Sequence, residues 1–327
     1  MKVCVYGAGA IGGQLAARLA KGGASVSVVA RGAHLAAIRG NGLTLNAHDG
    51  TTHCRPAASD NPRDLGPQDA VIVTVKSPAL PAVAANIAPL LGFDTPVVFV
   101  MNGMPWWYFD HEGGTHDGAH LHEADPGDAL RNAIGIRRAI GGVVYAAAEV
   151  VSPGVVTSEH ANIRLILGEP DGQISARAKA ISAALVAGGM PSPVSPDIRT
   201  EVWTKLLGNL SSAPICALTR LGVRDSLADP IIRAAARACA MEGQAIAAAL
   251  GRVVPDTVVE RVSNATMQHK PSLLQDLELG RPMEIDTMFT LPLRLARLVG
   301  VDTPQLDLLV ALVKQVARAR GLYPPLA

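Results

Sequence analysis

The sequence predicts an α/β protein in which a doubly wound, mostly parallel sheet at the N-terminus is followed by an all-helical C-terminal domain. In the first part of the chain, short apolar runs typical of buried strands alternate with helical patterns. From Ile198 onward nearly every apolar pattern has the helical period. The chain has 327 residues, which is long for a single core and fits two domains.

The first element is a strand, Val3–Tyr6, that runs directly into a glycine-rich turn. A helix is expected at Ile11–Leu19 and a second strand at Ala24–Arg31. Together they form one βαβ unit, whose turn and helix N-terminus hold the pyrophosphate of a dinucleotide in Rossmann-type domains. A glycine-rich packing turn without a ligand is the alternative. The residues expected to form the cofactor cradle are Gly7, Ala8, Gly9, Ala10, Ile11 and Gly12.

Each glycine of this run has its own expected role. Gly7 permits the tight turn, and Gly9 lets the backbone approach a pyrophosphate without a Cβ atom in the way. Gly12 lets the helix pack closely against the strand.

The end of the second strand indicates which dinucleotide binds. NAD-selective units usually carry an acidic residue there, which accepts a hydrogen bond from the ribose 2′-hydroxyl, whereas this chain has Arg31. A guanidinium can bind the 2′-phosphate of NADP, so NADP (as NADPH) is the expected cofactor. A solvated surface arginine is the other interpretation.

Two further buried strands are expected, at Asp69–Ser77 and Thr95–Gly103, with a helix at Leu80–Leu91 between them. Lys76 and Asn102 stand at the carboxyl ends of these strands, the edge where open α/β sheets bind ligands. Either residue can also be the solvated end of its strand.

A glycine-rich segment, 105–130, follows the second of these strands. Its four histidines lack the spacing of a metal motif, so a flexible or lid-like loop is expected rather than a metal site. Trp106 and Trp107 are expected to wall a pocket.

The domain boundary is expected in a proline-rich stretch near residue 195. Strands are predicted within 139–159 and 161–172 and a helix at 175–189 before this stretch. The prediction is therefore a Rossmann-type domain at 1–195 and a helical substrate and catalytic domain at 196–327.

Four polar residues of the helical domain are candidates for chemistry. Lys205 and Asn209 are four residues apart and so share one helix face, which is either a cleft-facing stripe or an ordinary exposed face. Ser272 follows a proline, where a hydroxyl often caps a helix or turn. Glu284 stands between Met283 and Ile285, and a carboxylate in such company is either paired or at a functional edge.

Over essentially its whole length the chain resembles the ketopantoate reductase family, also called 2-dehydropantoate 2-reductases. The features that carry the resemblance, in chain order, are "GAGAIG", Arg31, "VKS" at Lys76, "MNG" at Asn102, "KLLGN" at Lys205 and "PSLLQD" with "MEID" near the C-terminus. The resemblance implies reduction of the 2-oxo group of ketopantoate to D-pantoate by NADPH, in pantothenate and coenzyme A biosynthesis.

The resemblance also implies roles for individual residues. Lys205 would be the catalytic proton donor, with Glu284 as its carboxylate partner. Asn102 and Asn209 would face the substrate, and Ser272 would hold its carboxylate. The residues implied to lie at the cofactor beyond the glycine turn are Arg31, Lys76, Asn102 and Glu284.

Two departures from the family pattern put the identity of the 2-oxo acid in doubt. Ala213 stands where relatives often have a second asparagine, and the loop after Pro105 is longer and more aromatic. The alternatives are a reductase of a related 2-oxo or imino acid, of the opine-forming kind, and a non-catalytic NADP-binding redox sensor.

Charge, apolar runs and cysteine spacing limit the kinds of binding partner and compartment to expect. The formal net charge is +1, with no basic tract and no apolar run long enough to span a membrane, so neither nucleic acid nor a membrane is an expected partner. The four cysteines lack metal-site spacing and indicate a reducing, cytoplasmic compartment. The sequence leaves the oligomeric state open, with a homodimer as one candidate.

Overall fold

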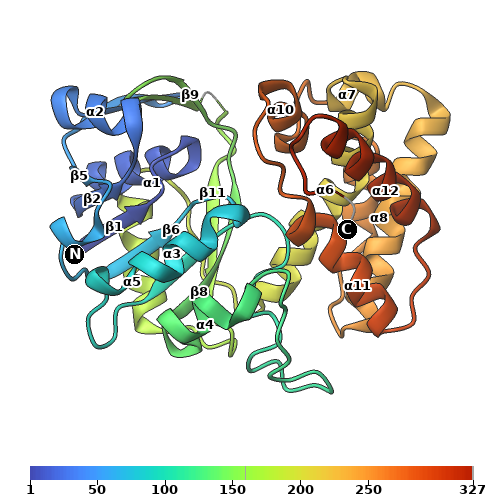
Figure 1. Ribbon diagram of the computed structural model, residues 1–327, viewed down its shortest axis with the longest axis horizontal. Helices are drawn as coiled ribbons and strands as arrows, with labels where there is room; N and C mark the ends of the chain where they lie inside the picture. The colour runs from blue at the N-terminus through green and yellow to red at the C-terminus, as the bar shows by residue number, and fades with distance from the viewer. Residues whose placement is uncertain (159, 326–327) are drawn as a thin grey trace. The chain divides into compact units, whose positions relative to one another are not determined.

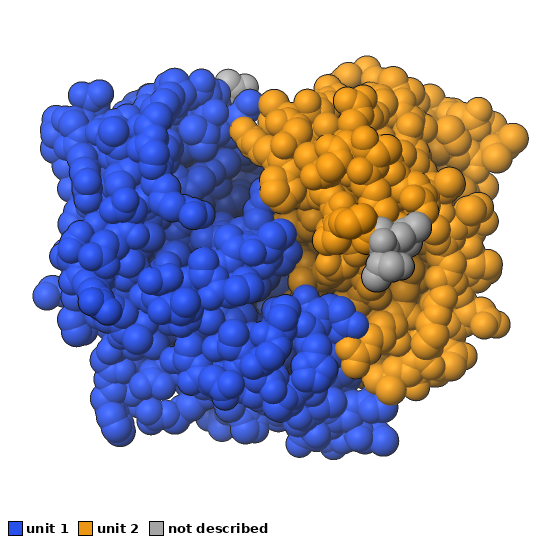
Figure 2. Space-filling model, in the orientation of Figure 1, with its two compact units in different colours: residues 1–101, 105–198 blue, residues 102–104, 199–327 orange. Residues whose placement is uncertain are grey.

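The computed structural model describes residues 1–158 and 160–325. The chain divides into two compact units: unit 1 comprises 1–101 and 105–198, and unit 2 comprises 102–104 and 199–327 (Figure 2). Glu159 and the last two residues of the predicted helical domain, 326–327, lie outside the described residues. The sequence placed a single boundary between 195 and 196, whereas the structure also assigns the short segment 102–104 to unit 2.

Unit 1 is built on a seven-stranded sheet with the strand order β11-β8-β7-β6-β1-β2-β5. All neighbouring strands are parallel except β11, which runs antiparallel to β8. The sheet is therefore doubly wound, as the sequence predicted, and its order reverses beside β1. The strands are β1 (Lys2–Tyr6), β2 (Ser25–Val29), β5 (Ala57–Ser59), β6 (Ala70–Val73), β7 (Val97–Val100), β8 (Ala139–Tyr145) and β11 (Arg164–Gly168).

The helices of unit 1 follow the predicted alternation with the strands (Figure 1). Apolar side chains of the first helix and of the strands share one buried core, in which Val3, Leu15, Leu19 and Val28 are fully buried. The helices are α1 (Ala10–Lys21), α2 (Gly32–Asn41), α3 (Leu80–Asn86), α4 (Ala129–Ile134) and α5 (Ala176–Ala187).

A second sheet, which the sequence analysis did not predict, has the order β4-β3-β10-β9 and packs on α1. It explains why α1 is buried on most of its surface. Gln14 donates from Nε2 to the Ser158 hydroxyl at 2.8 Å, and the fully buried Arg18 forms two 2.6 Å bonds with the Asp49 carboxylate. The strands are β3 (Leu43–Ala47), β4 (Gly50–Cys54), β9 (Glu149–Ser152) and β10 (Val155–Ser158).

Two predicted strands are shorter than expected. β6 ends at Val73 rather than Ser77, because Thr74 turns back to the glycine turn and Ser77–Ala79 forms a 3₁₀ turn with a proline inside it. β7 ends at Val100 rather than Gly103, and Gly103 has a positive φ of 81°, which lies outside the extended region of regular strands.

One prediction about the connecting segments is wrong. Trp106 and Trp107 do not wall an open pocket, because both are at most 2% exposed in the core of unit 1. Arg131 stacks on Trp106 and forms two 2.6 Å bonds with Asp110, which anchors the start of the 105–130 segment. The proline-rich stretch, where the sequence places the domain boundary, lies alongside β11 through backbone bonds donated by Leu165, Leu167 and Ser195.

Unit 2 is helical, as predicted (yellow to red in Figure 1). A π-helical turn, Asp286–Thr290, directly precedes α11. The described helices are α6 (Ile198–Thr219), α7 (Val223–Ser226), α8 (Pro230–Ala249), α9 (Asp256–Ser263), α10 (Ser272–Leu279), α11 (Leu291–Leu298) and α12 (Pro304–Ala319).

Candidate active site

In the glycine turn of unit 1, two glycines lie where a side chain would collide with neighbouring residues. Gly7 has a φ of 104°, and a Cβ atom there would lie 2.7 Å from the Val75 side chain. A Cβ atom on Gly12 would collide with the Gly7 carbonyl and the Thr74 hydroxyl. Glycine at these two positions therefore lets α1 begin directly against the end of β1.

Gly9 differs from these two glycines, because a Cβ atom there would have no neighbour within 4 Å. It is the N-cap of α1, whose first turn contains no acidic residue. The N–H groups of a first helical turn have no partner within the helix and attract an anion. Open space beside unopposed N–H groups fits the pyrophosphate of a dinucleotide.

The other residues of the run have unequal access to a ligand. Ala8 is buried, and the N–H groups of Gly7 and Ala8 both donate to the Val29 carbonyl. Ala10 and Ile11 open the helix and are partly exposed. The backbone of this run that is open to a ligand therefore lies at Gly9 and at the start of α1.

Thr74 is part of this turn and was not singled out in the sequence. Its hydroxyl donates to the Gly7 carbonyl at 2.6 Å, which ties the end of β6 to the turn. The sequence signal for it is a threonine that interrupts the apolar part of the strand predicted at Asp69–Ser77.

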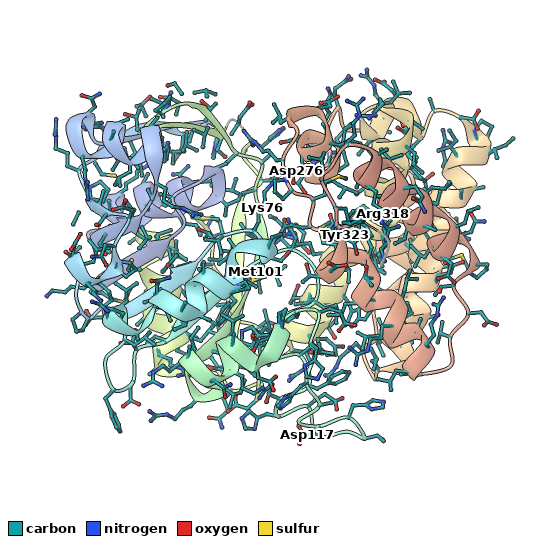
Figure 3. The ribbon with its side chains drawn as sticks, in the orientation of Figure 1. Lys76, Met101, Asp117, Asp276, Arg318 and Tyr323 are labelled. Atoms are coloured by element: carbon teal, nitrogen blue, oxygen red, sulfur yellow. The ribbon has the colours of Figure 1, made fainter. Side chains whose placement is uncertain are left out.

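Arg31 and Lys76 are both exposed in unit 1. Arg31 is the N-cap of α2 and lies near Tyr6, whose pKa is raised by burial and lowered to a smaller extent by the arginine charge. Lys76, labelled in Figure 3, precedes the 3₁₀ turn that follows β6. Both cations are placed on the loops that leave parallel strands.

In unit 2, Lys205 is held by Asn102. Its Nζ donates to the Asn102 side-chain oxygen at 2.8 Å, although 103 positions separate the two residues. Lys205 and Asn209 lie one turn apart on a partly exposed face of α6, while Trp203, Leu206 and Leu207 are buried. Lys205 and Asn209 therefore share one helix face, as their spacing predicts, and Asn102 belongs to the same unit.

Burial lowers the pKa of Lys205 to about 8, and the negative charge of Glu284 opposes this shift. Glu284 itself is 6% exposed, between the buried Met283 and Ile285. A lysine in this environment stays mostly protonated at neutral pH, yet gives up its proton far more readily than a lysine in water. Lys205, Asn102 and Glu284 form what we call the lysine cluster.

Ser272 is the first residue of α10 and is partly exposed. The N-cap is Pro271, so Ser272 does not cap the helix as the sequence had suggested. Ser272 thus brings a hydroxyl to the first turn of α10, whose N–H groups have no partner within the helix, and this combination is suited to a carboxylate. Asp276, one turn later and labelled in Figure 3, is buried.

Ser212 does not supply the polar side chain that is missing at position 213, where Ala213 stands in place of the asparagine of many relatives. Its hydroxyl donates to the Gly208 carbonyl of its own helix at 3.1 Å, and Ala213 is buried. Along the described part of the chain no three His, Cys, Asp or Glu side chains gather as a metal site. None of the helices described is long and apolar enough to cross a membrane.

Two family models match the chain. Residues 3–106 match the ketopantoate reductase PanE/ApbA model, and residues 197–317 match the model of its C-terminal part. A 2-dehydropantoate 2-reductase of Mesorhizobium japonicum is 46% identical over 99% of this chain and 100% of its own length.

The chain belongs to the ketopantoate reductase family.

Solved structures agree with this assignment. A proposed ketopantoate reductase of Ralstonia solanacearum has a TM-score of 0.90 and 40% identity, covering 98% of this chain and 99% of that one. A 2-dehydropantoate 2-reductase of Geobacter metallireducens has a TM-score of 0.84 and 28% identity, covering 96% and 99%. The resemblance inferred from the sequence motifs is therefore confirmed.

Proposed function

We propose that this ketopantoate reductase family member reduces the 2-oxo group of ketopantoate to the hydroxyl of D-pantoate with NADPH, in the synthesis of pantothenate and coenzyme A. The observation that carries the proposal is the lysine cluster. Lys205, whose pKa is about 8, donates a hydrogen bond to the Asn102 amide oxygen, and the buried Glu284 carboxylate favours its charged form. This arrangement supplies a proton at neutral pH.

When bound, the reduced nicotinamide supplies the hydride that adds to the 2-oxo carbon. The carbonyl oxygen gains negative charge in this step and needs a proton to become the hydroxyl. Lys205 donates that proton from Nζ, and Asn102 holds the Nζ while it does so. Glu284 favours the charged form of Lys205 before the reaction.

We propose that Ser272 binds the substrate carboxylate, with the first turn of α10 providing the favourable end of a helix dipole. Asn209, on the Lys205 face of α6, is the second amide expected at the substrate. We also propose that Arg31, Lys76, Asn102 and Glu284 contact the cofactor, and the exposure of the two cations supports this proposal for Arg31 and Lys76.

Steady-state kinetics on a panel of 2-oxo acids with NADPH tests this proposal. Ketopantoate should give the highest kcat/KM, and Lys205→Ala should lower kcat by about 10²–10⁴ while NADPH binding is retained. Lys179→Ala, at an exposed lysine of unit 1, is the matched control.

Each contrary outcome points to a specific alternative. A larger kcat/KM for another 2-oxo or imino acid would favour the related reductases. Tight NADPH binding without turnover of any acid would favour a redox sensor. A Lys205→Ala rate within a few-fold of native would show that another group protonates the oxygen.

A further inference from the structure

Gly103, between Asn102 and Met104, makes an unusually close backbone contact within unit 2. Its φ is 81°, and a Cβ atom there would collide with the Thr287 carbonyl oxygen and lie 2.5 Å from the Thr287 carbonyl carbon and 2.8 Å from the Met288 nitrogen. These neighbours are backbone atoms, which cannot rotate aside as a side chain would. The contact requires the absence of a side chain.

A hydrogen bond adjoins this contact. The N–H of Met104 donates to the Thr287 carbonyl at 2.9 Å. Thr287 lies in the π-helical turn Asp286–Thr290, where it is 1% exposed, and the turn begins two residues after Glu284. Because a π turn departs from the α-helical bonding pattern, its carbonyls can accept from another segment.

The contact links the two polar partners of Lys205. Asn102, immediately before Gly103, accepts the Lys205 hydrogen bond, and Glu284 lies two residues before the π-helical turn that Gly103 contacts. Segment 102–104 is joined to the rest of unit 2 by packing and not by chain continuity. What holds Asn102 at Lys205 must therefore be contacts of this segment.

We propose that Gly103 is a positioning residue that clamps segment 102–104 onto the π-helical turn and so keeps Asn102 in place to hold Lys205. The proposal rests on the proposed function only for its catalytic consequence. A side chain at position 103 would lift the segment from Thr287, move the Asn102 oxygen and release the Lys205 amine.

The first readout does not depend on activity. The full-length native protein and its variants are treated with an amine-reactive acylating reagent, and the labelling rate of each lysine is followed by mass spectrometry. Gly103→Ala should raise the rate at Lys205 several-fold relative to the exposed Lys179, because the amine loses its acceptor. Gly103→Asn should do the same, since Asn tolerates a positive φ but carries the Cβ atom.

Gly251→Ala is the matched control. Gly251 belongs to unit 2 and has a φ of 74°, but a Cβ atom there would have nothing within 4 Å. The Gly251→Ala variant introduces similar backbone strain without the carbonyl contact. Its Lys205 labelling rate and its kcat should therefore equal those of the native protein.

The second readout is kinetic. Gly103→Ala should lower kcat for ketopantoate about 10–100-fold, with KM for NADPH within twofold of native. If Gly103 acts through Asn102, the two losses should not multiply. The kcat of the Asn102→Ala/Gly103→Ala double variant should then be no lower than that of the less active single variant.

Several results would overturn the clamp: native labelling of Lys205 in Gly103→Ala, or a double variant whose loss is the product of the single losses. If neither Gly103 variant folds while Gly251→Ala does, Gly103 serves the stability of unit 2 and the positioning role is wrong. If the native protein does not turn over ketopantoate, the proposed function fails, and the labelling rates alone decide on the clamp.

Discussion

At the scale of single residues, the behaviour of Lys205 results from opposing effects. Burial disfavours its charged form, and Glu284 restores part of the loss. The Asn102 oxygen fixes where the amine lies, because an amide oxygen accepts a hydrogen bond from the ammonium group without neutralising the charge of that group. A lysine placed in this way is tuned for proton transfer near neutral pH.

The pKa of Lys205 predicts how activity depends on pH. The reaction needs the protonated amine, so kcat should fall as pH rises through about 8. Glu284→Gln removes the charge that raises this pKa, and the alkaline limb should therefore move to lower pH. A pH profile of single-turnover hydride transfer measures both effects.

Glu260→Gln, at an exposed glutamate of α9, should leave that profile unchanged. An alkaline limb that stays in place in Glu284→Gln would show that Lys205 does not set it.

Arg31 predicts cofactor selectivity. Arg31→Ala should weaken NADPH binding by roughly tenfold to a hundredfold, the cost of losing a charged hydrogen bond of about 1.5–3 kcal/mol, and leave NADH binding nearly unchanged. Titration of both nucleotides by fluorescence measures the ratio. Arg39→Ala is the control, because the Arg39 guanidinium bonds the Ala58 carbonyl instead. Equal native affinity for NADH and NADPH would refute the assignment.

At the scale of elements, the nucleotide cradle depends on where two elements stop. β6 ends early, and Thr74 at its end bonds the Gly7 carbonyl of the turn that follows β1. Gly12 then docks α1 against this pair. The position of the α1 N-terminus, and of any anion beside it, is set by all three contacts.

Thr74→Val should therefore weaken NADPH binding while the protein still folds. Valine keeps the shape of threonine but loses the hydrogen bond, worth about 1 kcal/mol, so the Kd should rise about fivefold. Thr51→Val is the control, because the hydroxyl of Thr51, an exposed residue of β4, donates to the Asn46 side-chain oxygen on β3. A native Kd in Thr74→Val, accompanied by a lower Tm, would mean that Thr74 contributes to stability alone.

At the scale of the whole molecule, the candidate groups are divided between two units. The glycine turn, Arg31 and Lys76 belong to unit 1, and the lysine cluster, Asn209 and Ser272 belong to unit 2. Separate buried clusters support the two units, one within residues 3–190 and one within 215–274. Each unit thus carries its own part of the proposed chemistry on its own packed scaffold.

Hydrogen–deuterium exchange should map the two ligands onto the two units. NADPH should slow exchange at the start of α1, where first-turn N–H groups gain a partner. Ketopantoate added to the NADPH complex should slow exchange at the start of α10. Peptides from the middle of α12 serve as the unaffected reference. Protection by NADPH confined to unit 2 would contradict the cradle.

The sequence by itself determined the kinds of elements and their order. The alternation of strands and helices, the glycine run and the helical period after Ile198 are local patterns, and each reports which face of an element is buried. The ordered motifs identified the family because each keeps a residue type that its local geometry or chemistry requires, as Gly7 and Gly12 do.

Only the tertiary structure decided what covers each buried face. The second sheet that encloses α1, the burial of Trp106 and Trp107, and the assignment of 102–104 to unit 2 are contacts between segments far apart in the chain. Local periodicity contains no information about a distant partner. Asn102 could therefore be predicted as a candidate, but its bond to Lys205 and the close contact of Gly103 with the Thr287 backbone are seen only in the tertiary structure.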